Sequence, residues 1–462
     1  MCLVHVQRFV WPHARPPTEE HVMWIERLHL SNYRCFEDFE IAFRPGFNVI
    51  AGVNGSGKTS LLMGLCQAAC PITLSSALKK PGNTVLGLSS LSEEGQARLK
   101  MEVFNGRFRF EPQYPIAIMI SASYADKKYN WSIEQQNAIA RPSIHGQHFD
   151  ATSDHQQTAG QPELLPIVVC YPANRQWRVP KNKRDNEAQA ITERQSRFHG
   201  YVNWWNASAD TNALQTWVIS KCLERFQTSS ETGLKFDDID DDELALVNHA
   251  LSAVLTEAKG LKYDLKQKSL LMEWRADSGD ARPATPFDQL SDGQRAMIAL
   301  VADIARRMCL LNPQLGAHVT AATPGVVLID ELDMHLHPHW QRLLTRGLKQ
   351  AFPAVQFIVT SHSPQVLGEL QAEEIILLQG AGTAHPQASY GLSSSQILQE
   401  IMGAEARTGQ VQTALDQLFA ALEHNQLEQA RVCLQQLRAD APDIPELAGA
   451  AALLRRKEVL GR

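Results

Sequence analysis

The 462-residue chain lacks the features that define several classes of protein. No stretch approaches the roughly 18 consecutive apolar residues of a membrane-spanning helix, so we expect no membrane span and no membrane partner. The cysteines contain no CxxC pair and no spacing typical of a disulfide framework or zinc site. They are Cys2, Cys35, Cys66, Cys70, Cys170, Cys222, Cys309 and Cys433. This pattern predicts a protein of the reducing cytoplasm.

The chain also has no excess of basic residues over acidic ones. The 44 Lys and Arg residues stand against 50 Asp and Glu residues, which gives a formal net charge of −6. Bulk nucleic-acid binding is therefore not supported, and any DNA contact must come from a local patch. The 44% of hydrophobic residues are ample for a core. Collagen-like chains, disulfide miniproteins and fully disordered chains are thereby excluded.

Residues 1–22 lack the long apolar segment and the cleavage site of a signal peptide. Met23 stands directly before the first strand-like run. We therefore hypothesise that translation begins at Met23 and that 1–22 is an N-terminal extension that is not translated.

Strands and helices alternate along the middle of the chain. Residues 24–43 predict two strands around a Ser31–Asn32 turn, and FNVIAG predicts a strand that enters a glycine-rich loop. Residues 60–69, 293–311 and 338–351 have helical patterns, and two amphipathic helices are expected between 210 and 259. The other predicted strands are LKMEVF, FRFEP, IAIMISAS, PIVVCY, SLLMEW, GVVLID and QFIVTS. The alternation predicts an α/β fold with parallel strands.

Two segments differ from this core. Gly, Ser, Gln and His are frequent from about 141 to 162, which predicts a surface loop. The last 70 or so residues carry apolar side chains at helical spacing and predict two or three helices. These apolar residues include Val411, Leu415, Leu418, Phe419 and Leu422.

The strongest chemical motif is GVNGSGKT, Gly52–Thr59, which fits GxxxxGK[ST] between a strand and a helix. The glycines let backbone N–H groups wrap phosphates, Lys58 reaches the outer phosphates, and Thr59 offers its hydroxyl to Mg²⁺. The candidate nucleotide-binding residues are Asn54, Gly55, Ser56, Gly57, Lys58, Thr59 and Ser60.

GVVLIDE, residues 325–331, is an apolar strand that ends in two carboxylates. It predicts that Asp330 joins the magnesium shell and that Glu331 acts as the catalytic base on the attacking water. Two acids after an apolar strand are a weak signal alone. They predict a magnesium site here because a phosphate-binding loop precedes them in the chain.

Two weaker motifs leave alternatives open. LSDGQ, residues 290–294, offers an anion site through Ser291, Gly293 and Gln294, but a helix N-cap explains the same residues. His362 in IVTSHSP has the position for a hydrogen bond to a terminal phosphate, or it is a structural histidine.

Taken in order, these motifs resemble the head domain of ABC-type ATPases, in the branch of RecF, SMC and OLD-like proteins. NYRCFEDFEI resembles that branch's opening strand pair, which implies that Arg34 lies near the nucleotide. The resemblance implies ATP and Mg²⁺ as ligands and an ATPase domain over 23–380. That domain would have a P-loop core sheet, N-terminal antiparallel strands and a helical middle insert at about 80–285. It also implies a homodimer or higher even oligomer, in which LSDGQ of one subunit meets the ATP of another.

The chain departs from that pattern after the acidic strand. His337 stands where transporters carry an aspartate, and no Q-loop glutamine is located. His335, His337 and His339 invite a zinc interpretation, but an HLHP string at this place is typical of the branch.

The C-terminal region carries a second resemblance. YGLSSSQILQEIMG, residues 390–403, and the tail that ends in PELAGAAALLRRKE are similar to the PtuA ATPases of Septu and retron-associated anti-phage systems. This implies a helical partner-binding region over 381–462 and a partner HNH nuclease like PtuB. A retron would add a reverse transcriptase and its nucleic acid. The residues after His362 contain no DxD motif, so nuclease activity is expected from a partner.

Two charge runs complete the candidates. A basic run beside Trp177 is the candidate DNA contact, with a solvated loop as the alternative. It consists of Arg175, Arg178, Lys181, Lys183 and Arg184. The acidic run Asp237–Glu243 predicts a helix start rather than a cation site.

The sequence therefore predicts an ATP-hydrolysing switch that controls a partner nuclease in anti-phage defence. A RecF-like DNA-repair ATPase without a nuclease partner is the main alternative. A transport subunit and a structural scaffold are two further ones.

Overall fold

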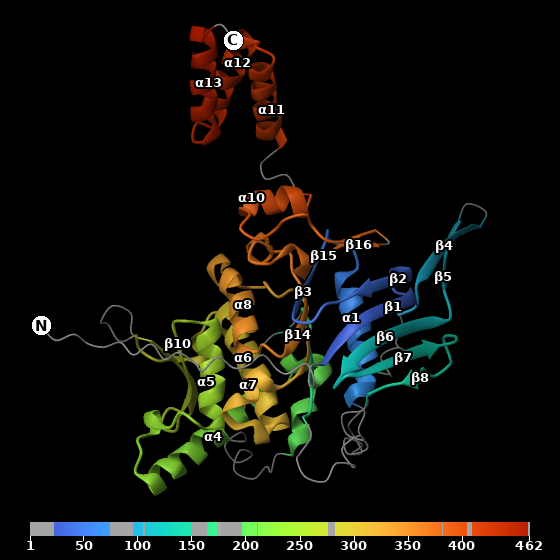
Figure 1. Ribbon diagram of the computed structural model, residues 1–462, viewed down its shortest axis with the longest axis vertical. Coiled ribbons are helices and arrows are strands. Elements are labelled where there is room, and N and C mark those ends of the chain that lie inside the picture. The colour runs from blue at the N-terminus through green and yellow to red at the C-terminus, as the bar shows by residue number, and fades with distance from the viewer. Residues whose placement is uncertain are drawn as a thin grey trace, which may run out of the picture. The chain divides into compact units, whose positions relative to one another are not determined.

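The computed structural model describes residues 23–73, 96–104, 107–149, 164–173, 175, 196–209, 211–275, 282–380, 382–403 and 409–460 (Figure 1). The chain divides into two units, Met1–Gly391 and Leu392–Arg462. Within the described ranges, no helix has the length and apolar content needed to cross a membrane.

A six-stranded sheet forms the centre of the first unit, in the order β16-β15-β3-β14-β13-β9. The strands from β15 to β9 are parallel, and β16 runs antiparallel to β15. Their bounds are β3 Phe47–Ala51, β9 Ile167–Tyr171, β13 Gly325–Ile329, β14 Val355–Thr360, β15 Ile375–Gln379 and β16 Gly382–Ala384. Every residue of β3, β9, β13 and β14 is buried, as expected for the largely apolar central strands of a parallel sheet. The predicted α/β core is confirmed.

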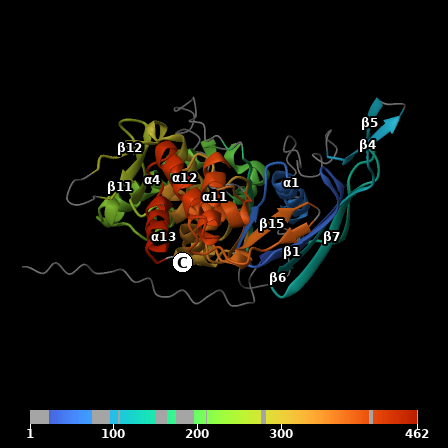
Figure 2. The ribbon, with the colours of Figure 1, turned by 90° about the horizontal axis from the view of Figure 1, so that it is seen from above.

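A second sheet is antiparallel and has the order β2-β1-β6-β7-β8. Its strands are β1 Met23–Tyr33, β2 Phe36–Ala42, β6 Ile116–Tyr124, β7 Lys127–Gln135 and β8 Ser143–Gln147. Helix α1, Lys58–Ala69, contacts strands of both sheets (Figures 1 and 2). Gly64 of α1 permits close packing, because a Cβ there would lie 3.0 Å from Leu30 Cδ2.

The structure corrects two predictions for this sheet. The turn between the first two strands lies at Arg34–Cys35, and Ser31–Asn32 belong to β1. The predicted surface loop at 141–162 contains β8 over residues 143–147, while 150–163 lie outside the described residues. β8 is SIHGQ and largely exposed, so it carries little of the apolar alternation that identifies a strand.

Strands β4, Leu99–Phe104, and β5, Arg107–Pro112, form a separate antiparallel pair that extends beyond the second sheet (Figure 2). One face carries apolar residues that are 54–68% exposed: Leu99, Met101, Val103, Phe108 and Phe110. A third sheet has the order β10-β11-β12, with bounds Ala258–Asp264, Ser269–Trp274 and Thr285–Pro286. The insert at about 80–285 therefore contains strands as well as the predicted helices.

The long helices are α4 Thr211–Thr232, α5 Glu243–Val254, α6 Asp292–Leu311 and α8 Pro338–Ala351. α5 packs against both α6 and α8 (Figure 1). The predicted helices between 210 and 259, at 293–311 and at 338–351 are confirmed. Short helical turns are η2 Cys70–Thr73, η6 Arg197–Tyr201, η7 Trp204–Ala209, η8 Phe236–Asp238, η9 Phe287–Gln289, η10 Pro313–His318, α7 Val319–Ala322, α9 Pro364–Leu367 and η11 Ala372–Glu374.

The second unit contains α10 Ser394–Gln396, the π-helical turn η12 Ile397–Ile401, and helices α11 Gly409–Glu423, α12 Leu427–Asp440 and α13 Glu446–Leu460. The last three helices share a core of their own, which includes Leu415, Leu418 and Leu422. Phe419 was predicted on the apolar face but is 37% exposed.

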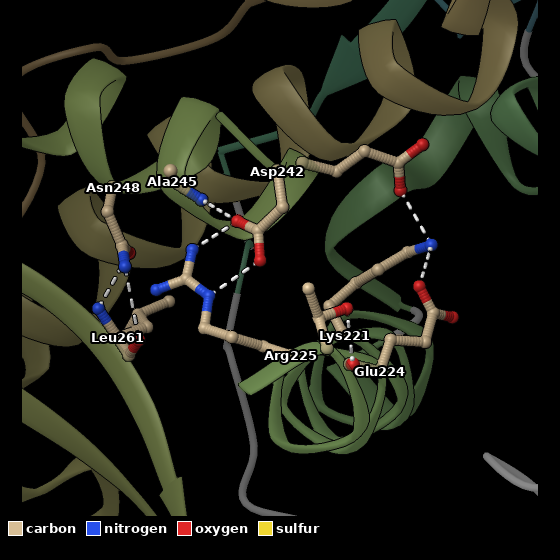
Figure 3. A network of polar contacts seen from close by, with 9 residues as sticks. Lys221, Glu224, Arg225, Asp242, Ala245, Asn248 and Leu261 are labelled. Atoms are coloured by element: carbon tan, nitrogen blue, oxygen red, sulfur yellow. Dashed lines mark hydrogen bonds and ion pairs between the residues drawn. The ribbon is translucent and has the colours of Figure 1, made fainter. Parts of the chain in front are cut away.

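The acidic run starts α5, as predicted. Asp242 is the N-cap residue, and its Oδ1 accepts a 2.8 Å hydrogen bond from Ala245 N. Figure 3 shows that Arg225 of α4 binds both carboxylate oxygens of Asp242. Lys221 pairs with Glu224 at 2.8 Å and with Glu243 at 2.7 Å. The Arg225–Asp242 and Lys221–Glu243 pairs tie α4 to the start of α5.

A buried charge cluster joins α6 to the parallel sheet. Asp303 Oδ2 accepts hydrogen bonds from Tyr171 Oη and Arg307 Nε, both at 2.8 Å, and Oδ1 accepts from Arg306 Nη2 at 2.6 Å. Burial raises the pKa of Asp303, but Arg307 and Arg306 outweigh it and hold the pKa below its ordinary value. Tyr171 is the last residue of β9, which pairs with β13. This cluster therefore fixes α6 beside the end of β9.

We predict that Asp303→Asn lowers the free energy of unfolding by about 3–5 kcal/mol at pH 7, because it leaves two buried arginines without their counter-charge. The lowered pKa means that the ionised carboxylate contributes fully at neutral pH and loses its contribution only as the pH falls through that pKa. Urea denaturation of both proteins measures the difference. Glu40→Gln is the control, because the Arg27–Glu40 pair is more than half exposed and is worth at most about 1 kcal/mol. Equal effects of the two substitutions would contradict the account.

Candidate nucleotide-binding site

A cavity of about 310 Å³ lies where β3, β13 and β14 end. Because these strands are parallel, their carboxyl ends meet at one edge of the sheet. The lining residues are Cys35, Asn54, Gly55, Gly57, Lys58, Thr59, Ser60, Asp330, Glu331, Thr360 and His362. The structure thus brings the glycine-rich loop, the two acids and the histidine together.

The loop after β3 depends on glycine. Gly55 and Gly57 have φ angles of +82° and +97°, in the left-handed region that favours glycine. A Cβ at Gly57 would also lie 2.7 Å from Cys35 Sγ and 2.8 Å from Phe36 Cζ. Gly57 is the N-cap of α1, so the helix N-terminus, with its free N–H groups, opens at this cavity.

The ammonium group of Lys58 lies against the same loop. Its Nζ donates to Gly52 O at 3.0 Å and Val53 O at 2.9 Å, and lies 3.5 Å from Ser56 Oγ. Burial lowers the pKa of Lys58, while Asp330 and Glu331 partly offset this. The lysine is thus held at the cavity through weak carbonyl acceptors that an anion can replace.

The two acids follow β13 and are joined through Thr360. Thr360 Oγ1 donates to Asp330 Oδ1 at 2.6 Å and accepts from Glu331 N at 2.7 Å. Glu331 has φ +48°, an uncommon conformation for a residue with a side chain. The backbone therefore turns sharply at Glu331 while both acids still line the cavity.

His362 is held by Asp333, which the sequence analysis missed. Asp333 Oδ1 accepts from Ser361 Oγ at 2.6 Å and from His362 N at 3.3 Å. Burial, and then the charge of Lys58, lower the pKa of His362, so its ring is neutral at pH 7. An acid two positions after Glu331 was the only available sequence signal for Asp333.

Gln341 of α8 links the same two loops. Its Nε2 donates to Asp333 O at 3.1 Å and Leu336 O at 3.0 Å, and its Oε1 accepts from Ser363 Oγ at 2.7 Å. A glutamine inside a helix carries no motif, so the sequence gave no reason to select it.

The described residues that line the cavity do not include Arg34, Ser56 or the LSDGQ segment. Arg34 Nε donates to Gln96 Oε1 at 3.1 Å, although its neighbour Cys35 lines the cavity. Ser291 caps α6 in a capping box with Gln294, as the N-cap alternative predicts. Gly293 packs tightly, since a Cβ there would lie 2.2 Å from His335 O.

His337 of HLHP caps the start of α8, where its Nδ1 accepts from His339 N at 3.3 Å. No group of three or more His, Cys, Asp or Glu residues in the described part of the chain is arranged to hold a metal ion.

Arg175 requires a correction. It was grouped with the candidate DNA contact, but it is only 5% exposed, and its guanidinium binds carbonyl oxygens of Asp330, Glu331 and Leu332. A buried side chain with these partners is not available to DNA. Arg178, Lys181, Lys183, Arg184 and Trp177 lie outside the described residues, so their DNA contact stays a prediction.

The donor set fits a magnesium nucleotide. A helix N-terminus and a glycine loop with its lysine suit phosphate groups. Thr59 and Asp330 place a hydroxyl and a carboxylate, which are hard oxygen ligands, on the same cavity.

The chain is similar to several known proteins. A family model described as an AAA domain matches residues 27–265, and a second AAA-domain model matches 231–368. The retron Ec83 probable ATPase of Escherichia coli is 42% identical over 440 residues, covering 82% of this chain and 76% of that protein. The Septu protein PtuA of Bacillus thuringiensis is 28% identical over 403 residues, covering 82% of this chain and 84% of that protein. The SMC head bound to the C-winged helix domain of ScpA has a TM-score of 0.42 at 14% identity, covering 78% of this chain and 97% of that one.

The fold and the matches define an ATPase with an AAA-type nucleotide-binding domain. The predicted α/β ATPase fold, with an N-terminal antiparallel sheet and C-terminal helices, is confirmed. The chain belongs to the ATPase family that includes the retron Ec83 ATPase, and the predicted resemblance to retron and Septu ATPases is confirmed.

We predict that Thr360→Val lowers the free energy of unfolding by about 1–3 kcal/mol, because the N–H of Glu331 loses its buried acceptor. Thr360→Ser keeps the hydroxyl and should recover most of this loss. Urea denaturation measures both. Thr345→Val is the matched control, because Thr345 is buried and its Oγ1 has no hydrogen-bond partner among the described residues. A Thr360→Val effect no larger than that of Thr345→Val would refute the linkage.

Proposed function

We propose that this ATPase is a switch that closes as a dimer around ATP, reopens after hydrolysis, and thereby controls a partner HNH nuclease in anti-phage defence. The observation that carries the proposal is the cavity, in which phosphate-binding and hydrolytic residue types from distant parts of the chain share one edge of the sheet. The similarity to retron and Septu proteins supports the biological setting.

The residues of the cavity that match the sequence motifs have separate tasks in the proposed hydrolysis. The loop amides and Lys58 bind the β- and γ-phosphates, and Thr59 and Asp330 hold the magnesium ion. Bound magnesium neutralises charge that builds up on the phosphates. Glu331 accepts a proton from the attacking water, and neutral His362 makes a hydrogen bond to the terminal phosphate.

The proposed dimer places Ser291 and the N-terminus of α6 against the nucleotide of a second copy. Two observations support a mechanical link between that surface and the acids. Gly293 packs on the His335 carbonyl, and Asp303 binds Tyr171 beside β13. A nucleotide that touches both copies only when they are closed shifts the equilibrium by its differential affinity. Arg34 remains a further candidate near the nucleotide.

The C-terminal unit is the proposed docking region for the partner. Its helices α11 to α13 have a core of their own, so they fold as a body separate from the ATPase unit. A reverse transcriptase and its nucleic acid would join the assembly where the chain works in a retron.

We predict that Glu331→Gln keeps ATP affinity within about threefold and lowers kcat at least about 100-fold, because the amide cannot accept the proton. Phosphate release measures turnover, and a fluorescent ATP analogue measures binding. Glu373→Gln, an exposed change on η11, is the control and should match the wild type. Unchanged hydrolysis in Glu331→Gln would remove the catalytic assignment.

We predict that the chain, expressed with its native neighbouring genes, co-purifies with an HNH-type protein in stoichiometric amounts. Purification with and without ATP, followed by mass spectrometry, identifies the partner and any ATP dependence. A chain that ends at Gly391 should keep ATPase activity and lose the partner, since its ATPase unit is complete. A bare dimer whose ATPase activity appears only on addition of DNA would instead support a repair ATPase without a nuclease.

A further inference from the structure

Three successive carbonyl groups leave the sheet where β13 ends. They belong to Asp330, Glu331 and Leu332, and they follow the strand directly. Buried backbone carbonyls need hydrogen-bond donors, and those beyond the last strand residue have no ladder to supply them.

One side chain donates to all three. Arg175 Nη1 donates to Asp330 O, and Nη2 donates to Glu331 O at 2.7 Å and to Leu332 O at 3.4 Å. Arg175 follows β9, which pairs with β13 in parallel, so the two strands end side by side. The arginine therefore reaches across from the neighbouring strand end.

The N–H groups of the same three residues donate to acceptors at the ends of β9 and β14. Asp330 N donates to Tyr171 O at 2.9 Å, and Leu332 N donates to Thr360 O at 2.9 Å. Glu331 N donates to Thr360 Oγ1 at 2.7 Å. Glu331 O also accepts from Met334 N at 3.0 Å. Every backbone polar group of this turn thus has a partner, and Arg175 is the one donor that all three carbonyls share.

The chemistry of arginine suits this place. Its planar guanidinium presents several N–H donors in a fixed fork, whereas a lysine ammonium is a compact charge that cannot reproduce that geometry. Burial lowers the pKa of Arg175 to about 10, with Asp330, Asp333 and Glu331 acting in the opposite direction, so the group stays charged at pH 7. Arg175 is not among the described residues that line the cavity.

We propose that Arg175 is a positioning residue for ATP hydrolysis, which holds Glu331 in its left-handed conformation and so aims its carboxylate at the attacking water. This role rests on the proposed function, because it acts through the proposed catalytic base. Arg175 contacts backbone rather than nucleotide, so its loss should affect turnover far more than ATP binding.

Arg175→Lys tests the proposal while keeping the charge. We expect kcat to fall about 10- to 100-fold, because a small misplacement of a catalytic group has effects of that size, while ATP affinity stays within about threefold. Phosphate release and a fluorescent ATP analogue measure the two quantities. Arg175→Ala removes the fork and the charge and should lower kcat at least as far.

Two controls separate positioning from general damage. Arg225→Lys removes another buried guanidinium group, which binds Asp242. It should shift the thermal midpoint of unfolding about as much as Arg175→Lys does, but it should leave kcat unchanged. In a Glu331→Gln background, Arg175→Lys should lower the residual turnover no further, because the base through which it acts is already absent.

The outcomes are distinguishable. Wild-type kcat in Arg175→Lys, or a loss of ATP affinity as large as the loss of kcat, overturns the positioning role alone. An additive loss in the double variant also overturns it. A wild-type chain without any turnover overturns the proposed function and this role together.

Discussion

The alignment of parallel strand ends is the constraint on which the site depends. β3, β13 and β14 pair in parallel, so the phosphate loop, the acids and the histidine leave the sheet at one edge although they are far apart in the chain. Binding residues at the carboxyl ends of such strands are a general property of open α/β sheets. The burial of all residues in these strands makes that edge a rigid support.

Around this edge, single polar side chains bind residues of more than one loop. Thr360 serves both acids, Asp333 serves the His362 loop, and Gln341 joins that loop to the segment after the acids. Arg175, which follows β9, binds the carbonyl groups after β13. Each of these groups thus holds two or more segments of the chain together.

The sequence was sufficient for the parts whose chemistry is local. FNVIAG and GVVLID predicted two of the strands, and the motifs GVNGSGKT and GVVLIDE predicted most of the residues that line the cavity. Glycine conformation and apolar runs are properties of short segments, so the sequence alone reveals them. Asp333 and Gln341 were missed because their partners come from separate loops. Arg175 was misread because a run of cations looks alike in sequence whether it is buried or exposed. β8 was missed because a polar, exposed strand has little apolar alternation.

The most direct test of the account is an experimental structure of the Glu331→Gln protein with ATP and magnesium. The account predicts a triphosphate in the cavity against Lys58 and Thr59, with Ser291 of a second copy facing the γ-phosphate and the Arg175 fork still on the carbonyls after β13. Nucleotide bound elsewhere, or bound in the cavity with no second copy over it, would contradict the proposed switch.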